Sequence, residues 1–257
     1  MRNVFMTAAL CVAASSLSIA TPALAATEIL FSGNSSTDGT DGNIRSFSNG
    51  GVSVQASGWS VRDGTTLENA YLGAYGGGLG VTNRNEGNGA SNNSHTIDNV
   101  GQFDFVLLVF NAAVNIASAK LNPFAVSSDP LDNDAQVSFG NLAGAFNAAN
   151  PTAVPVNSPV WSQLDANDYT VSGNNTSPYS TSLNSAGNFG NVWLIGAART
   201  NPDSRGDGFK LGAITVNTLN SAVPEPGTWA MMLLGFGMLG AVLRRRNTSV
   251  STSFRFA

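Results

Sequence analysis

The chain has 257 residues, a formal net charge of −4, one cysteine and one histidine. Residues 26–222 contain 15 acidic and 7 basic residues, a net charge of −8, which disfavours nucleic acid and anionic phospholipid as partners. The cysteine is Cys11. No thiol therefore lies beyond it to form a disulfide, a thiol nucleophile or a zinc–thiolate site.

Residues 1–25 have the pattern of a secretory signal peptide. Arg2 supplies a positive charge, residues 4–19 are apolar, and residues 23–25 read Ala-Leu-Ala. This order of charge, apolar run and small residues is what signal peptidases recognise. We expect cleavage between Ala25 and Ala26, followed by export.

Residues 26–220 predict one all-β domain. They are rich in Gly, Asn, Ser and Thr, with short apolar runs between turn signals. We expect a single antiparallel β-sandwich of jelly-roll-like form. Residues 103–110 are its most apolar run and predict a central strand buried on both faces, followed by a separate strand over 114–121. The Ala-rich stretch 141–150 favours one short helix.

Glu86, Asp98 and Asn99 form a candidate metal site. Two carboxylates and an amide oxygen are suited to Ca²⁺, which takes 6–8 oxygen ligands. The alternative is that Asp98 and Asn99 only shape a turn before the central strand. Structural Ca²⁺ is the only cofactor that the sequence suggests.

A second acidic group comprises Asp129, Asp132, Asn133 and Asp134. Its spacing does not match an EF-hand loop, and we expect a solvated loop. Serine-based catalysis would need a histidine base, and the only histidine, His95, directly follows Ser94, so the two would point to opposite faces of a strand. We expect no enzymatic activity.

The segment 221–246 contains three successive features. Pro224, Glu225 and Pro226 come first, an uncharged run from Trp229 to Leu243 follows, and Arg244, Arg245 and Arg246 close it. As a helix the run would be about 22 Å long, shorter than the roughly 30 Å hydrocarbon core of a bilayer. We expect a short transmembrane helix with the arginines on the cytoplasmic side, and a tail over residues 247–257.

These residues resemble a PEP-CTERM sorting signal. The resemblance implies that exosortase, a membrane-embedded transpeptidase, processes the chain near Pro224–Pro226 and removes a helix that contacts the membrane only transiently. It also implies export through the inner membrane and a final location that is extracellular, on the cell surface or at the outer membrane.

The body resembles exosortase-dependent surface proteins in a second set of residues, which comprises Gly78–Asn83, Glu86, His95, Asp98, Asn99, Gly101 and Asp104–Leu107. The sequence therefore predicts an exported, non-enzymatic component of the cell surface or of an exopolysaccharide or biofilm matrix. The alternatives are a calcium-dependent carbohydrate-binding module and a hydrolase that uses two carboxylates.

Overall fold

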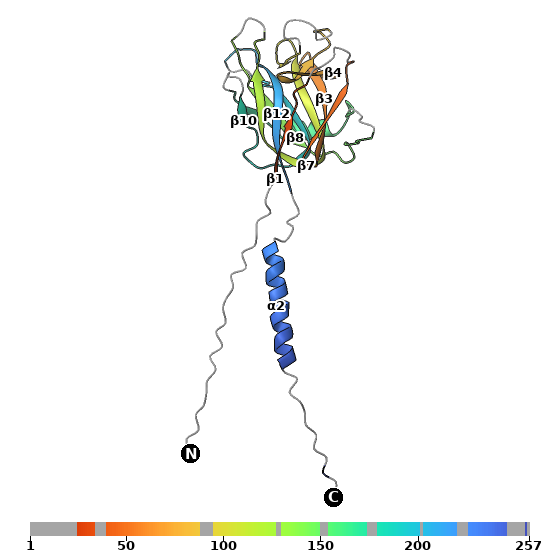
Figure 1. Cartoon of the computed structure of the whole chain (residues 1–257). Coiled ribbons are helices and arrows are strands. Elements are labelled where there is room, and N and C mark those ends of the chain that lie inside the picture. The colour runs from red at the N-terminus through yellow and green to blue at the C-terminus, as the bar shows by residue number, and fades with distance from the viewer. Residues whose placement is uncertain are drawn as a thin grey trace. The chain divides into compact units, whose positions relative to one another are not determined.

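We describe the fold from a computed structural model of the whole chain (Figure 1). It describes residues 25–33, 40–87, 95–126, 130–149, 154–173, 179–200, 203–219 and 226–245, and Arg255. The chain divides into two compact units, residues 24–219 and the two terminal segments 1–23 and 220–257. Residues 1–24 of the expected signal peptide (residues 1–25) lie outside the described residues, so that prediction is not tested here.

The body is built of strands, as the sequence predicted, and in its described part they form one 12-stranded sheet. The elements of the body are β1 (Ala25–Leu30), β2 (Ile44–Asn49), β3 (Val52–Arg62), β4 (Thr66–Tyr75), β5 (Gly78–Thr82), β6 (Ile97–Asp98), β7 (Phe103–Pro123), β8 (Ala135–Gly140), α1 (Val160–Ala166), β9 (Asp168–Val171), β10 (Ser180–Ser182), β11 (Gly190–Ala197) and β12 (Gly208–Thr218).

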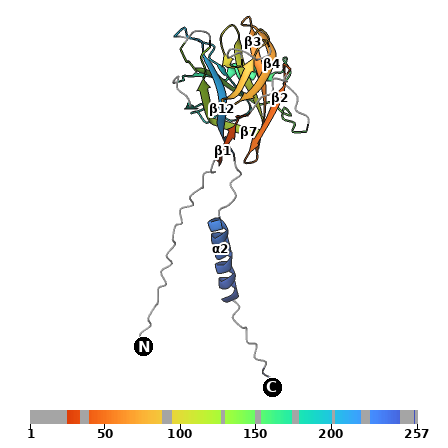
Figure 2. The same ribbon diagram turned by 45° about the horizontal axis from the view of Figure 1, so that its top comes forward.

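The sheet closes into a ring, whereas the sequence led us to expect a sandwich, which the structure does not confirm. Neighbouring strands follow the order β12–β5–β4–β3–β7, and β7 pairs with β12 to complete the circuit. Figure 2 shows β2, β3 and β4 side by side along one part of this wall. A second branch, β11–β8–β9, extends from β7.

Closure depends on the length of β7. Residues 103–110 pair with β3, from Phe103 opposite Val61 to Phe110 opposite Val54. Residues 114–123 pair with β12 instead. The expected break between two strands is absent, because residues 111–113 stay extended although they are exposed. A single strand of 21 residues therefore replaces the two strands that we predicted.

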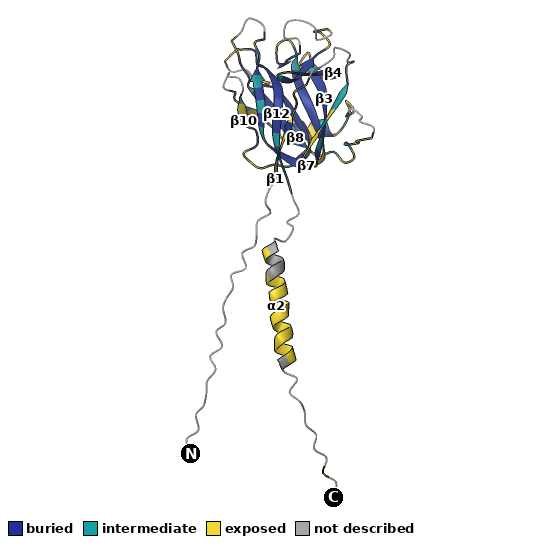
Figure 3. Cartoon of the chain, viewed as in Figure 1, coloured by how far each residue is buried: buried dark blue, intermediate teal, exposed yellow. Residues whose placement is uncertain are grey.

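The two faces of β7 enter two different apolar clusters, which confirms that its first half is buried on both sides. Val106, Leu108 and Phe110 face the interior of the ring. Phe105 and Leu107 alternate with them and join the cluster beneath α1. Figure 3 shows the resulting buried strands.

The short helix is α1, not the Ala-rich stretch 141–150. Residues 141–149 contain no helix, and Gly144 within them adopts a φ of 71°, outside the right-handed helical region. Pro159 directly precedes α1, and Val160 and Leu164, one turn apart, are buried against the sheet. Helix propensity was overridden there by a turn.

We predict that Gly80→Ala destabilises the body. A Cβ at this position of β5 would overlap the backbone carbonyl oxygen of His95, which cannot move without disturbing the segment that leads to β6. Urea unfolding should show a loss of more than about 2 kcal/mol. Gly76→Ala is the matched control, since its Cβ would meet open space. Equal stability of the two variants would contradict the close approach.

Candidate functional site

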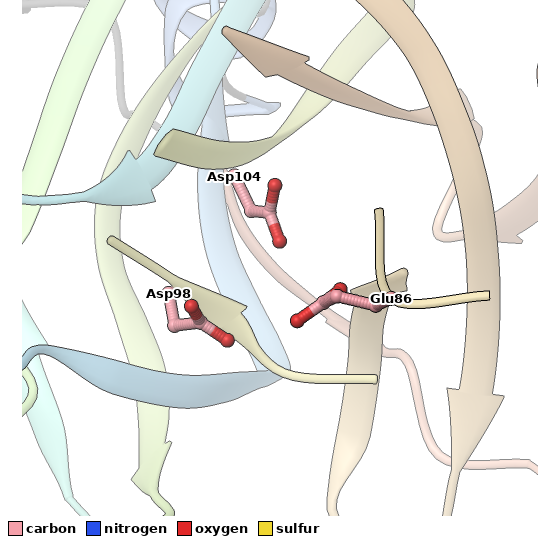
Figure 4. Close-up of side chains that lie close together, drawn as sticks. All are labelled: Glu86, Asp98 and Asp104. Carbon is pink, nitrogen blue, oxygen red and sulfur yellow. The ribbon is translucent and has the colours of Figure 1, made fainter. Parts of the chain in front are cut away.

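Three carboxylates gather at one end of the ring interior. Glu86 lies in the turn after β5, Asp98 ends β6, and Asp104 is the second residue of β7. One oxygen of each lies within 4.8 Å of the others. In Figure 4 the three carboxyl groups point toward a common space. The structure thus brings together two of the residues that the sequence suggested, and adds Asp104.

Asn83 holds two of the three carboxylates in place. Its backbone N–H donates to Glu86 Oε2 at 2.9 Å, and its side-chain Nδ2 donates to both oxygens of Asp104 at 3.2 and 3.3 Å. The backbone N–H of Glu86 returns a bond to the carbonyl of Asn83 at 3.1 Å, closing the turn. Asp98 is fixed separately, since its Oδ1 accepts from the backbone N–H of Val100 at 3.0 Å.

Burial makes these carboxylates unusually basic. Asp98 and Asp104 are only 3% and 1% exposed. Burial, followed by the charge of Glu86, raises the pKa of Asp98 to about 8, and burial raises the pKa of Glu86 to about 7. Burial, Asp98 and Glu86 raise the pKa of Asp104 well above its usual value. Without a cation the cluster therefore retains protons near neutral pH.

Against the rise caused by burial, the positive charge of Lys210 in β12 lowers the pKa of Asp98, but the ammonium group of Lys210 contacts other residues. Its Nζ donates to the carbonyl of His95 at 2.8 Å and lies 4.5 Å from the ring centre of Phe124. Burial lowers its pKa to about 8, although the charge of Asp98 opposes that shift. The ion pairs recorded among the described residues involve other carboxylates. Among the described residues, no ion pair therefore involves the three carboxyl groups of the cluster.

Asn99 does not join this cluster. Its Nδ2 donates to Asp207 Oδ2 at 2.6 Å and to the carbonyl of Ala198 at 3.0 Å, and its Oδ1 accepts from the backbone N–H of Asp207 at 2.9 Å. Asp98 and Asn99 are adjacent, so their side chains diverge. Sequence proximity to Asp98 suggested Asn99 as a ligand. Asp104 was missed because it lies in an apolar strand, although a polar residue between Phe103 and Phe105 could have indicated it.

The second acidic group is not the solvated loop that we predicted. Asp132 is 4% exposed and Asn133 is fully buried, while Asp129 lies outside the described residues. The loop is drawn inward because the carbonyl of Asp132 accepts from the backbone N–H of Gly208 at 2.8 Å and Asn133 Nδ2 donates to the carbonyl of Leu121 at 3.1 Å.

Asp132 and Asp134 instead form a second carboxylate cluster with Asp207, also within 4.8 Å. Backbone donors hold it, since Asp134 N–H bonds Asp207 Oδ1 at 3.2 Å and Gly173 N–H bonds Asp134 Oδ1 at 2.5 Å. Burial and the charges of Asp132 and Asp134 raise the pKa of Asp207 to about 7. This cluster ties three loops together.

The sorting residues fall partly within α2 (Pro226–Arg245). Pro226 begins this helix, Trp229 lies in its first turn, and Arg244 and Arg245 end it, while Pro224, Glu225 and Arg246 are outside the described residues. In Figure 3 the ribbon of α2 has the colour of exposed residues along residues 231–244. In the described part of the chain no helix combines the length and apolarity that a bilayer crossing requires, so the transmembrane prediction is not confirmed.

A mostly β body followed by a Pro-Glu-Pro motif, an uncharged run and a basic cluster is the arrangement of an exported protein with a C-terminal sorting signal. Residues 222–246 match the family described as the PEP-CTERM protein-sorting motif. The motif implies processing by exosortase, export across the inner membrane and placement at the surface or outside the cell. No curated protein and no solved structure matches the chain.

We predict that Ca²⁺ stabilises the body more at pH 8 than at pH 5. Unfolded carboxyls titrate near pH 4, whereas Glu86 and Asp98 do so at about 7 and about 8 when folded. The folded state therefore binds more protons, and without a cation its stability falls as pH rises from about 4 to about 8. A bound cation would replace those protons. It should bind more tightly at pH 8, where the carboxyl groups lose their protons, than at pH 5, where they keep them.

Calorimetric melting at both pH values, in EDTA and in Ca²⁺, measures this effect. Asp98→Asn should flatten the pH dependence in EDTA and reduce the Ca²⁺ effect, whereas Asp63→Asn, a change in an exposed turn, should alter neither. A melting temperature that is the same in EDTA and Ca²⁺ at both pH values would rule out cation binding.

Proposed function

We propose that this protein is an exported, exosortase-processed, non-enzymatic component of the cell surface or of an exopolysaccharide or biofilm matrix. The observation that carries the proposal is the sorting motif at residues 222–246. It is continuous with α2, whose side chains from Met231 to Arg244 are exposed. Such a helix offers an apolar surface for transient contact with the membrane and with the processing enzyme.

The surroundings of the candidate residues support a non-catalytic body. His95 is the only histidine, and its ring packs against that of Tyr75 at a centroid distance of 4.3 Å while its carbonyl binds Lys210. Asp98 and Asp104 are almost fully buried, whereas a glycosidase needs its two carboxyls on either side of an accessible bond. This geometry favours a structural cation or proton cluster over acid–base catalysis.

We predict that replacing Arg244, Arg245 and Arg246 with Gln blocks maturation. The arginines hold the end of the apolar run on the cytoplasmic side, and without them its orientation toward the processing enzyme is lost. Fractionation of producing cells should show the triple variant as an unprocessed, membrane-associated precursor.

Arg255→Gln is the matched control, because it removes an exposed positive charge beyond the motif. It should mature as the unmodified chain does. Normal processing and normal location of the triple variant would refute the proposed role of the basic cluster.

The carboxylate cluster specifically favours a second candidate, a calcium-dependent carbohydrate-binding module. Glu86, Asp98 and Asp104 would supply oxygen ligands to Ca²⁺ and so tie the turn after β5 to β6 and β7. Ca²⁺ would then order this end of the body for binding.

A glycan array probed in Ca²⁺ and in EDTA distinguishes the two candidates. The carbohydrate-binding candidate predicts signals that disappear in EDTA and are reduced about tenfold by Asp98→Asn, because one ligand of the ion is lost. Asp63→Asn serves as the control. The absence of a glycan signal in both conditions would reject the carbohydrate-binding candidate and would leave the matrix-component proposal in place.

A further inference from the structure

The body has a groove on the outer face of the sheet, separate from both carboxylate clusters. Its volume is about 310 Å³, at the small end of the range for ligand pockets, roughly 300–1,000 Å³. It lies where β3, β4 and β7 meet α1 and the end of β11. Phe105, Leu164 and Leu194 line it and are buried, and Phe103 and Trp161 line it and are half-buried.

Trp161 is held rigidly in this groove. Its ring meets that of Trp59 at 4.9 Å and an interplanar angle of 64°, and that of Phe105 at 6.1 Å and 71°. Its Nε1–H donates to the carbonyl of Pro155 at 2.9 Å. Because the N–H group is already bonded, the indole offers a ligand its apolar ring, in a fixed orientation that costs little entropy on binding.

The rim of the groove is polar but carries no net charge among its lining residues. Arg199 Nη2 lies 3.4 Å from Asp165 Oδ1, and both side chains are exposed. Thr65 and Gly64 line the groove from the β3–β4 turn, where positive φ angles at Asp63 (52°) and Gly64 (69°) fit a tight hairpin turn. The rim thus offers hydrogen-bond donors and acceptors together.

This combination selects one class of ligand. An aromatic surface suits a ring with apolar C–H faces, and a paired guanidinium and carboxylate suit hydroxyl groups, which both donate and accept. A purely apolar ligand would make no use of the paired Asp165 and Arg199, and a strongly charged ligand would have to break their pair. A nucleic acid is further disfavoured by the net charge of −8 over residues 26–222.

We infer that this groove binds a sugar unit of a neutral polysaccharide, which stacks on Trp161 and hydrogen-bonds to Asp165 and Arg199. The inference deepens the matrix role proposed above and rests on it for the source of the polysaccharide. It makes the exported body an adhesive element rather than a passive one.

Isothermal titration of the exported protein with neutral hexasaccharides (cellohexaose, laminarihexaose and mannohexaose) and with hexagalacturonate tests this inference. At least one neutral hexasaccharide should bind. Trp161→Ala should weaken binding at least about tenfold, through loss of the stacking surface. The combined change Asp165→Asn and Arg199→Gln should also weaken binding at least about tenfold, and it leaves the buried apolar side chains beneath α1 unchanged.

Two controls keep the test independent of folding and of processing. The exposed pair Asp203 and Arg205, 3.8 Å apart and outside the groove lining, receives the same Asn and Gln changes and should leave binding intact. Melting temperatures identify any unfolded variant, in which case the Asp165–Arg199 change decides. The inference would be overturned by absence of binding, by unchanged binding in both groove variants, or by a preference for hexagalacturonate. If C-terminal processing is normal in that case, the proposed matrix role is not affected.

Discussion

The pairing of β7 with β3 along one half and with β12 along the other is the interaction on which the rest of the body depends. It closes the ring of strands, and it fixes which side chains face in and which face out. On the inner face the alternation runs from Phe110 down to Asp104, so the buried apolar core ends in a carboxylate. On the outer face it runs through Phe105 to Phe103, which line the groove under α1. One strand therefore supports both candidate sites without bringing them together.

The sorting motif and the candidate binding sites lie in different parts of the chain. The sorting motif belongs to the unit that contains residues 220–257, whereas the carboxylate clusters and the groove belong to residues 24–219. Within the body, Ala26 pairs with Asn217, so the expected mature N-terminus would begin inside β1, beside the strand that leads out toward the sorting segment. Removal of either terminal segment leaves the hydrogen-bonded ring complete, which suits a domain that is cut at its C-terminus after export.

Sequence patterns predicted the strand-rich class and the sorting motif because both are local. Closure of the ring was missed, since it depends on residues 111–113 staying extended, and nothing in Asn-Ala-Ala requires that. Of the candidate cation site, Glu86 and Asp98 were predicted and Asp104 was missed. Glu86 and Asp98 stood in a polar loop, but Asp104 reaches them only through the register of β7, and Asn99 turns away to bond Asp207. The buried Asp132 and Asn133 were mistaken for a solvated loop because their partners, Gly208 and Leu121, are distant in sequence.

We propose that the C-terminal segment is a removable signal attached to the compact unit of residues 24–219. Intact-mass spectrometry of the protein from cells with and without exosortase tests it most directly. The account predicts that exosortase-positive cells yield a chain that begins at Ala26 and ends near Pro224–Pro226, without the arginines, and that exosortase-negative cells retain the full C-terminus. A mature chain that still carries Arg244–Arg246 in exosortase-positive cells would contradict it.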